Sequence, residues 1–404
     1  MSLKIDFVER AQKGEKIAPL CEEFGISRTT GHKWVKRFEE LGYAGLDEES
    51  RRPKTTPLAT AEDVVMAVLE ARDAHPRWGP QKLQILLQRR FGEQTPSERT
   101  VARILARANR VQARRRRRPA NVVERAPQER AEMPNEIWTA DYKGWWRASN
   151  GQRCEPLTVR DAFSRFVLTI TICPTRTLES RAVFERLFQK YGLPRAMQCD
   201  NGVPFVSVRS RGGISTLSAW WLSLGIKLVR SRPGCPQDNG GHERMHRDVS
   251  ADVQSMPAAN RDSQQRLLDR WKQEFNHVRP HQALGGKTPG EVYTPSQRRI
   301  SDCQPFTYPA TFLVTKVTHR GMFFIRRDEY FLSGSLVGHY VGIERIDDFH
   351  VKAWFRDLDL GLIEVEPQVD DQIFDRAPRT TTQKAEPPKR RKGPSDRQPP
   401  RYKV

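Results

Sequence analysis

The sequence predicts a central α/β domain, with helical units before it and a small β-rich piece after it. Three observations carry this prediction. Apolar residues at helical spacing recur up to about residue 110, and β-branched and aromatic runs begin near residue 137. Strand-like and helix-like segments then alternate to residue 295, which is the order of a mixed α/β domain. Short strand-like runs between Gly or Asp turns fill residues 310–365 and are typical of a small β-barrel.

The length of 404 residues is typical of two to four domains, and the composition indicates a nucleic-acid partner. The formal net charge is +20, which favours encounter with polyanions. A basic surface that serves only solubility or a ribosome is the alternative. No apolar run is long enough to be a transmembrane helix, and the N-terminus lacks a signal-peptide pattern, so we expect a cytoplasmic protein.

Residues 1–50 are predicted to form a helix-turn-helix DNA-binding domain, with Gly25 in the turn and Ser27 capping the second helix. Apolar residues recur at helical spacing on both helices, namely Ile17, Leu20 and Phe24 and then Trp34, Phe38 and Leu41. The other face of the second helix carries the residues expected in the DNA major groove, which are Arg28, Thr29, His32, Lys33 and Lys36. An ordinary helical hairpin with a solvated basic face is the alternative.

Residues 58–112 repeat this pattern and are predicted to form a second helix-turn-helix DNA-binding domain, with Ser97 capping its last helix. The apolar positions are Val64, Val65, Val68, Leu69, Leu83, Leu86, Leu87, Val101, Ile104 and Leu105. Arg99, Arg103 and Arg107 face away from the apolar side of that last helix, and we expect the first two to contact DNA. Two such units in tandem would read a longer DNA site than one.

A basic linker is predicted over residues 113–133, because it contains five consecutive arginines: Arg114, Arg115, Arg116, Arg117 and Arg118. Blocks of like charge stay disordered until a partner neutralises them. The run is either an arm laid along DNA phosphates or in a minor groove, or a solvated linker.

The α/β core is predicted over residues 134–295. Its expected strands are 137–146, 155–163, 164–173, 195–200 and 226–231, and its expected helices are 177–191, 215–225 and two after residue 238. A small β-barrel is predicted over residues 305–368. The proline-rich basic segment 375–404 lacks the apolar content to fold, so we expect it to be disordered.

Three acidic residues in the core are the candidate metal ligands and catalytic residues. Asp141 lies on a strand among apolar and aromatic neighbours, Asp200 ends a short strand before Asn201 and Gly202, and Glu243 begins a helix. Metal-dependent cleavage of a phosphodiester needs carboxylates from different elements to converge on one point. Each residue has a structural alternative, namely an ion pair, an Asx turn or a favourable charge at a helix N-terminus. Together they have few structural explanations.

Other polar residues are assigned lesser roles. We interpret Asp161 and Arg165 as a turn and a structural pair, rather than as catalytic groups. Gln237 and Asn239 are predicted to contact DNA near the cut, and Arg244 and Arg247 to reach phosphates, although a solvated helix face explains the two arginines nearly as well. His246 follows Glu243 by three positions on the same helix and is a candidate for assisting at the site, although the structural alternative is stronger.

Five motifs in order resemble the bacterial insertion-sequence transposases related to retroviral integrases. They are WTADYKG, DAFSRF, QCDNGVPF, SRPGCPQDNGGHERMHR and FNHVRPHQALGGKTP, and the resemblance spans about residues 1–295. It implies an RNase H-like catalytic core in which Asp141, Asp200 and Glu243 form a DDE triad.

The chain departs from this family in two places. Glu243 lies 43 positions after Asp200, a longer separation than is usual, and residues 207–216 look like the insertion responsible. Retroviral integrases also carry an N-terminal zinc module. Only His32, His75 and Cys21 occur in the first 110 residues here, so a four-ligand zinc site cannot be built, and the helix-turn-helix units replace it.

The resemblance implies two Mg²⁺ or Mn²⁺ ions per site. In this hypothesis, one ion with Asp141 and Asp200 activates a water that cuts the transposon end, and the other, with Asp141 and Glu243, stabilises the leaving oxygen. The freed 3′-hydroxyl then attacks target DNA. The expected partners are terminal inverted repeats, target DNA and at least one further copy of the chain, in a bacterial nucleoid. The alternatives are an inactive or domesticated DNA-binding regulator and a nuclease without strand transfer.

Overall fold

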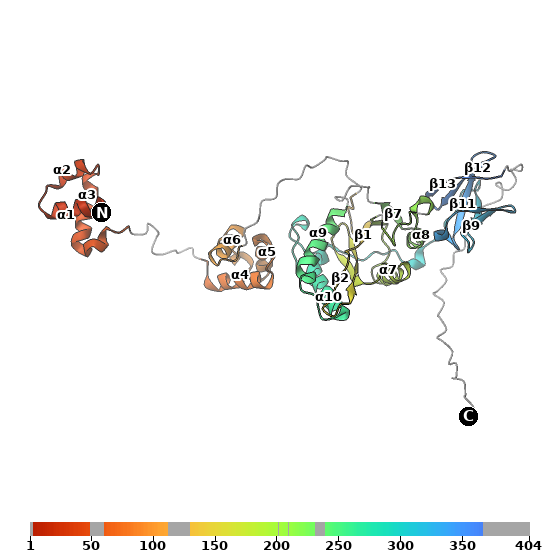
Figure 1. The fold of residues 1–404 in the computed structure, drawn as a ribbon, viewed down its shortest axis with the longest axis horizontal. Coiled ribbons are helices and arrows are strands. Elements are labelled where there is room, and N and C mark those ends of the chain that lie inside the picture. The colour runs from red at the N-terminus through yellow and green to blue at the C-terminus, as the bar shows by residue number, and fades with distance from the viewer. Residues whose placement is uncertain are drawn as a thin grey trace, which may run out of the picture. The chain divides into compact units, whose positions relative to one another are not determined.

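The computed structural model describes residues 3–48, 60–111, 130–200, 202–208, 210–230 and 239–366 (Figure 1). The chain divides into two compact units, Met1–Val65 and Met66–Val404, and each is described by itself. None of the helices in these described ranges is long and apolar enough to cross a membrane.

The first unit is a bundle of three helices and a 3-10 turn. These are α1 (Leu3–Gln12), α2 (Ile17–Glu23), α3 (Arg28–Leu41) and η1 (Gly42–Leu46). Gly25 has a φ of 63° in the turn, and Ser27 Oγ accepts a hydrogen bond from Thr30 N at 3.2 Å, so both predicted signals are confirmed. Gly31 lets α3 pack closely, because a Cβ there would stand 2.5 Å from Cys21 Sγ. The predicted apolar face of α3 does not extend to Leu41, because this side chain is 62% exposed at the end of the helix.

The next three helices are α4 (Glu62–Ala74), α5 (Pro80–Phe91) and α6 (Glu98–Arg107), with η2 (Gly92–Gln94) before the last. The predicted cap at Ser97 is confirmed by a hydrogen bond from Thr100 N to its hydroxyl at 3.3 Å. The fully buried or nearly buried apolar residues are Val64, Ala67, Val68, Leu83, Leu87, Val101, Ile104 and Leu105. The helical periodicity of the sequence therefore identified the inward face.

The core of the second unit is a five-stranded sheet in the order β5-β4-β1-β6-β7. The strands are β1 (Ile137–Tyr142), β4 (Pro156–Asp161), β5 (Val167–Ile172), β6 (Ala196–Cys199) and β7 (Lys227–Arg230). β1, β4 and β5 pair antiparallel, whereas β6 and β7 run parallel to β1. The predicted mixed α/β core is thereby confirmed. The first predicted strand was too long, because β1 ends at Tyr142 and Gly144, with a φ of 85°, precedes a separate hairpin.

Helices cover both faces of this sheet (Figure 1). On one side α7 (Thr177–Tyr191) and α8 (Thr216–Ser223) pack against Trp138 and Ala140 of β1. On the other side lie α9 (Gly240–Val249), the π-helical turn η5 (Ser250–Gln254) and α10 (Arg261–His277), together with the hairpin β2 (Trp146–Arg147) and β3 (Arg153–Cys154). Successive strand residues point to opposite faces, so Thr139 and Asp141 face α9.

Two side-chain amides of helix α10 form hydrogen bonds with the backbone of the edge strand β5. Asn276 accepts a hydrogen bond from Val167 N and donates one to Val167 O, both at 2.9 Å. Gln265 makes the equivalent bonds to Ile172 N and Ile170 O, each at 2.8 Å. An edge strand leaves backbone groups unpaired, and these amides satisfy them without a further strand.

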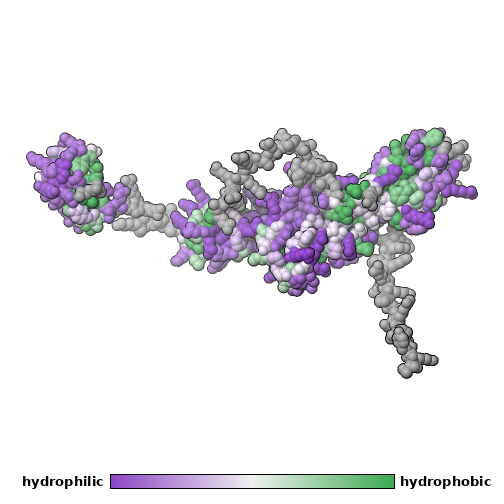
Figure 2. Space-filling view, in the orientation of Figure 1, coloured by the Kyte–Doolittle hydropathy of each residue, from purple (hydrophilic) through white to green (hydrophobic). Residues whose placement is uncertain are grey.

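The C-terminal strands form one sheet of four, in the order β13-β12-β11-β8, and one of two, β10-β9. They are β8 (Leu313–Lys316), β9 (Met322–Ile325), β10 (Asp328–Phe331), β11 (Tyr340–Arg345), β12 (His350–Phe355) and β13 (Leu358–Glu364). A closed barrel is not confirmed by this arrangement and stays a prediction. Hydrophobic residues gather on the surface over these strands (Figure 2), among them Phe331 and Phe349. Short helical turns complete the second unit, namely η3 (Arg211–Gly213), η6 (Gln282–Leu284), α11 (Pro289–Val292), η7 (Ile300–Asp302) and η8 (Gly334–Leu336).

The segment predicted to be an insertion, residues 207–216, packs into the core of these C-terminal strands. Ile214 is fully buried in the same cluster as Phe323 and Ile343. Ser210 Oγ lies 2.6 Å from Ser333 Oγ, and Arg211 Nη1 donates to the Leu362 carbonyl oxygen at 2.8 Å. The segment therefore joins the strand end that carries Asp200 to the C-terminal sheet.

Candidate active site

Asp141 is the most buried of the three candidate acids. It lies next to the last residue of β1 and pairs with Thr158 of β4. Its carboxylate is 19% exposed, and its Oδ2 accepts a hydrogen bond from Asn239 Nδ2 at 3.1 Å. Burial, together with the negative charges of Asp200 and Glu243, raises the pKa of Asp141 to about 7 against the hydrogen bonds that lower it. The charges of the two other acids therefore act on the Asp141 carboxylate.

Asp200 follows β6 directly, at the same edge of the sheet. Ala140 of β1 pairs with Cys199 of β6, and these strands are parallel, so Asp141 and Asp200 leave neighbouring strands side by side. Gly202 N donates to Asp200 Oδ1 at 3.2 Å, which is the Asx turn considered as the structural alternative. The turn holds an exposed carboxylate in place and leaves its other oxygen available.

Glu243 is exposed in the first turn of α9, the helix that crosses this edge. Its nearness to Asp141 is visible in the pKa of Asp141, which the charge of Glu243 raises. Within the ranges that the structure describes, no three His, Cys, Asp or Glu side chains stand close enough to hold one metal ion. Among the described residues, the candidate acids therefore form no closed coordination cage in this conformation.

Two histidines of α9 face Asp141 and its neighbours, and sequence reasoning missed the first of them. His242 is 1% exposed, with Nδ1 2.8 Å from Thr139 Oγ1 and Nε2 3.0 Å from Thr158 Oγ1. His246 Nε2 lies 2.8 Å from Thr158 Oγ1, and its Nδ1 lies 3.9 Å from Asp141 Oδ2. Burial, together with the charges of Lys143 and Arg160, lowers the pKa of His246 to about 3. The four-residue spacing of the two histidines was the available signal.

A buried arginine underlies the start of α9 and was also missed. Arg160 of β4 is 8% exposed, and its Nε has no hydrogen-bond partner. Burial lowers its pKa to about 10. Its guanidinium packs so closely under Gly241 that a Cβ at that position would stand 2.6 Å from Nη1. A side chain at position 241 would therefore displace the Arg160 guanidinium where α9 crosses β4.

Several predicted roles change in the structure. Asn239 Nδ2 donates to Asp141 Oδ2, and its predicted contact with DNA stays a prediction. The turn at Asp161 is present, because its carboxylate accepts from Ser164 N, Ser164 Oγ and Asn135 N. The predicted pairing with Arg165 was wrong, since no ion pair joins the two among the described contacts and Asp161 is already satisfied by these donors. Gln237 lies outside the described residues.

Except for the half-buried Asn239, the side chains predicted to contact DNA are exposed wherever they are described. On α3 these are Arg28, Thr29, His32, Lys33 and Lys36, on α6 they are Arg99 and Arg103, and on α9 they are Arg244 and Arg247. Lys36 forms a weak ion pair with Glu40 at 3.9 Å, and Arg103 donates to Thr100 Oγ1 at 3.2 Å. Arg114, Arg115, Arg116, Arg117 and Arg118 lie outside the described residues. Exposure leaves the described side chains free to meet a phosphate or a base.

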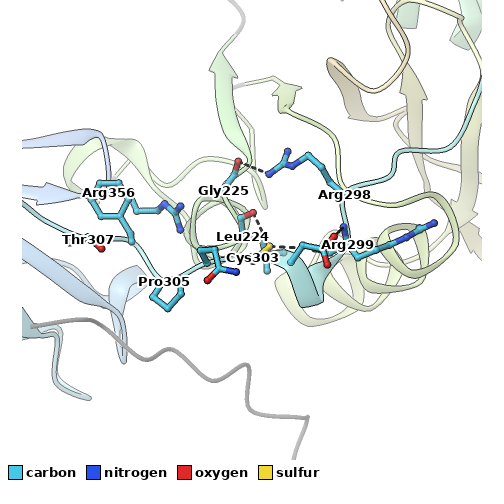
Figure 3. A pocket seen from close by; sticks show the side chains of 11 residues that line it. Leu224, Gly225, Arg298, Arg299, Cys303, Pro305, Thr307 and Arg356 are labelled. Atoms are coloured by element: carbon cyan, nitrogen blue, oxygen red, sulfur yellow. Dashed lines mark hydrogen bonds between the residues drawn. The ribbon is translucent and has the colours of Figure 1, made fainter.

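A cavity of about 460 Å³ lies away from these acids, between the end of α8 and Arg356 of the C-terminal part (Figure 3). Its polar groups are used by the chain itself. Arg298 Nη2 donates to the Gly225 carbonyl oxygen at 3.2 Å, and Cys303 Sγ donates to the Leu224 carbonyl oxygen at 3.3 Å. None of the three candidate acids lines it. The cavity is therefore a junction in the fold, away from the three candidate acids.

Family comparisons place the acidic edge within a known domain. Two models described as integrase core domain match residues 131–236 and 224–289. A model described as helix-turn-helix domain matches residues 3–54, and one described as homeodomain-like domain matches residues 30–105. The matches agree with the predicted order of DNA-binding units and α/β core.

Similar proteins come from bacterial insertion elements. The chain is 25% identical over 287 residues to the insertion element IS476 uncharacterized 39.2 kDa protein of Xanthomonas euvesicatoria, covering 69% of this chain and 78% of that protein. It is 27% identical over 261 residues to the insertion element IS407 uncharacterized 31.7 kDa protein of Burkholderia multivorans, covering 62% and 86%.

Among solved structures, the HTLV-2 integrase catalytic core domain in complex with magnesium matches with a TM-score of 0.32 and 19% identity, covering 41% of this chain and 100% of that one. The simian T-cell lymphotropic virus intasome in complex with PP2A regulatory subunit B56 gamma matches with a TM-score of 0.35 and 17% identity, covering 75% and 100%. At these TM-scores the likeness is too weak to assign a fold by itself.

Proposed function

We propose that this chain, which belongs to the integrase-core superfamily and carries helix-turn-helix DNA-binding domains, is a DNA transposase of an insertion element. It cuts DNA at the element's ends and joins the freed 3′-hydroxyl to target DNA. Asp141, Asp200 and Glu243 carry this chemistry. The supporting observation is that Asp141 and Asp200 leave neighbouring parallel strands at one edge of the sheet, while Asn239, at the start of the helix of Glu243, donates to Asp141. Burial, together with the charges of Asp200 and Glu243, also raises the pKa of Asp141.

The donor set fits divalent cations of the Mg²⁺ or Mn²⁺ class. Asp141, Asp200 and Glu243 offer hard oxygen atoms, and their mutual repulsion favours a cation among them. When bound, two such cations activate the attacking oxygen and stabilise the leaving oxygen of a phosphodiester. The carboxylate of Asp141 would be shared, because the charges of both Asp200 and Glu243 act on it.

The surrounding residues prepare the site for DNA. Asn239 holds Asp141 Oδ2 through its amide, so this carboxylate keeps one orientation before substrate arrives. Arg244 and Arg247 are exposed on the helix of Glu243, where they would neutralise phosphates beside the cut. The exposed faces of α3 and α6 would read the terminal repeats, and joining two ends would need at least two copies of the chain.

Cleavage of the element's own end DNA tests this function. The full chain is incubated with a labelled end duplex and Mg²⁺ or Mn²⁺, and the 3′ ends are mapped. We expect site-specific nicking by the wild type and at least a 100-fold loss in Asp200→Asn, while end binding is retained. Asp262→Asn, an exposed acid at the start of α10, is the matched control and keeps activity. Cleavage that persists in Asp200→Asn would exclude the triad.

A DNA-binding regulator without catalysis is the second candidate. The observation in its favour is that the described residues hold no closed cluster of three metal-binding side chains. The regulator also predicts specific end binding, but no product under any divalent cation. Binding without cleavage by the wild type, with both Mg²⁺ and Mn²⁺, would therefore favour it over the transposase.

A further inference from the structure

The hydroxyl of Thr158 is the hub of a hydrogen-bond network behind Asp141. Thr158 Oγ1 lies 2.9 Å from the Asp141 carbonyl oxygen, 2.8 Å from His246 Nε2 and 3.0 Å from His242 Nε2. The hydroxyl is wholly buried, so no bulk water shares these contacts. Three partners surround a group that has one proton to give and two lone pairs to offer.

With both imidazole rings neutral, as a metal-binding histidine must be, only one arrangement of protons satisfies all three contacts. A carbonyl oxygen can only accept, so Thr158 donates its single proton to the Asp141 carbonyl. Both histidines must then donate Nε2–H to the Thr158 oxygen. For His242 this leaves Nδ1 as an acceptor, and Thr139 Oγ1 supplies a proton to it at 2.8 Å. His242 is therefore fully used within the fold.

His246 is left with an unprotonated Nδ1 that has no such donor. This nitrogen lies 3.9 Å from Asp141 Oδ2, with two acceptor lone pairs facing across the gap. The separation is too long for a direct hydrogen bond. It suits a shared cation, because two ligand atoms that each stand about 2.0–2.2 Å from one ion are at most about 4.3 Å apart.

We propose that His246 Nδ1 is a further ligand of a divalent cation held by Asp141, so that the site takes Mn²⁺ in preference to Mg²⁺. The proposal rests on the proposed function, because it adds a nitrogen to the carboxylate site assigned there. Imidazole nitrogen is a better ligand for transition metals than for Mg²⁺, which prefers oxygen. A metal-bound histidine ordinarily donates its other ring N–H to a fixed acceptor, and the Thr158 hydroxyl is that acceptor here.

Pulsed electron paramagnetic resonance of Mn²⁺ on the full chain tests the ligand directly. Wild-type protein is prepared with natural and with ¹⁵N-labelled histidine, and the nitrogen modulation of the bound Mn²⁺ signal is recorded. We expect a directly bonded ¹⁴N coupling that changes to the ¹⁵N pattern on labelling. This measurement needs no variant, so it stands even if a substitution at His246 fails to fold.

Variants then test whether the coupled nitrogen belongs to His246. His246→Asn should lose the coupling and weaken Mn²⁺ binding about 10-fold or more while changing Mg²⁺ binding less, as ligand-shell changes commonly do. His319→Asn, an exposed histidine of the C-terminal part, is the matched control and should leave both unchanged. Circular dichroism and thermal melting establish that each variant is folded.

The possible outcomes distinguish a failure of the His246 ligand from a failure of the proposed carboxylate site. Mn²⁺ that binds the wild type and is lost in Asp141→Asn, but shows no nitrogen coupling, overturns the role of His246 and leaves the carboxylate site intact. A coupling that persists in folded His246→Asn overturns the assignment as well. Wild-type protein that binds no Mn²⁺, or binds it equally in Asp141→Asn, overturns the carboxylate site together with the inference.

Discussion

Replacing Asp141 by Asn should stabilise the metal-free protein at neutral pH. The pKa of Asp141 is raised to about 7 by burial and by the charges of Asp200 and Glu243, from an ordinary value of 3.8. An unfolded aspartate releases its proton near pH 4, whereas the folded one keeps it until about pH 7. Between these values the folded state binds more protons, so stability falls as pH rises through this window.

The size of the effect follows from the same values. One pKa unit corresponds to about 1.36 kcal/mol. The difference between the folded and unfolded pKa of Asp141 therefore corresponds to about 4 kcal/mol of unfolding free energy once the pH exceeds 7. The carboxylate is 19% exposed and solvent screens part of its charge, so we expect about 2–4 kcal/mol. An asparagine cannot ionise, and its side-chain oxygen can still accept from Asn239. The variant therefore loses the penalty and keeps the hydrogen bond.

Equilibrium urea unfolding in EDTA, from pH 5 to 8, measures this. The free energy of unfolding of the wild type should fall across the range, while that of Asp141→Asn stays nearly level. A saturating divalent cation, at about 100 times its Kd, should return roughly 2.7 kcal/mol to the wild type only. Parallel curves for wild type and variant would refute the reasoning, because they would mean that Asp141 titrates at its ordinary pKa. The exposed Asp262→Asn controls for removing a charge.

Three further predictions concern the fold and the DNA contacts. Asn276→Ala should lower the free energy of unfolding by about 2–5 kcal/mol in urea titrations, because it leaves both backbone groups of Val167 buried without partners. Ile214→Ala should cost about 2–4 kcal/mol in the same assay, since Ile214 is fully buried where the segment after Asp200 meets the C-terminal sheet. Lys33→Ala should weaken binding to all DNA sequences and reduce the slope of log affinity against log salt by about 1, as loss of one phosphate contact does.

Each of these has a neighbouring control. Gln273 is exposed on the same helix as Asn276, Val208 is 90% exposed in the same segment as Ile214, and Lys13 is exposed outside α3. Alanine at each should be nearly neutral. A loss at Asn276 or Ile214 no larger than at its control would contradict the packing argument, and an unchanged salt slope in Lys33→Ala would remove α3 from the DNA contact.

Local chemistry made much of the fold readable from the sequence. Ser27 and Ser97 announce helix starts because their hydroxyls accept from a backbone N–H three residues later, a contact that needs no distant partner. The end of β1 was predicted wrongly because it depends on a backbone turn and not on residue type. Aromatic residues continue past Tyr142, and only the backbone turn at Gly144 decides that they belong to another hairpin.

From the sequence, only the acidic residues of the candidate site could be predicted, and not the residues that contact them. Sequence reasoning selected Asp141, Asp200 and Glu243 from residue type and element ends, and these three stay a prediction until cleavage is measured. It missed His242, Arg160 and the contact of Asn239 with Asp141. Each of these touches a residue roughly 80 to 100 positions away, so its partner depends on which strands are neighbours and in what register.

The sequence by itself determined the order of the units, the basic character, the helix caps and the choice of candidate acids, because these follow from residue type and short-range spacing. Tertiary structure alone decided how the acids are surrounded. The sheet order brings β4 between β1 and β5, and α9 then crosses the polar face where Thr139, Thr158 and Asp141 meet. Burial in that crossing raises the pKa of Asp141 and leaves one histidine nitrogen facing it. Neither effect exists until distant segments exclude water together.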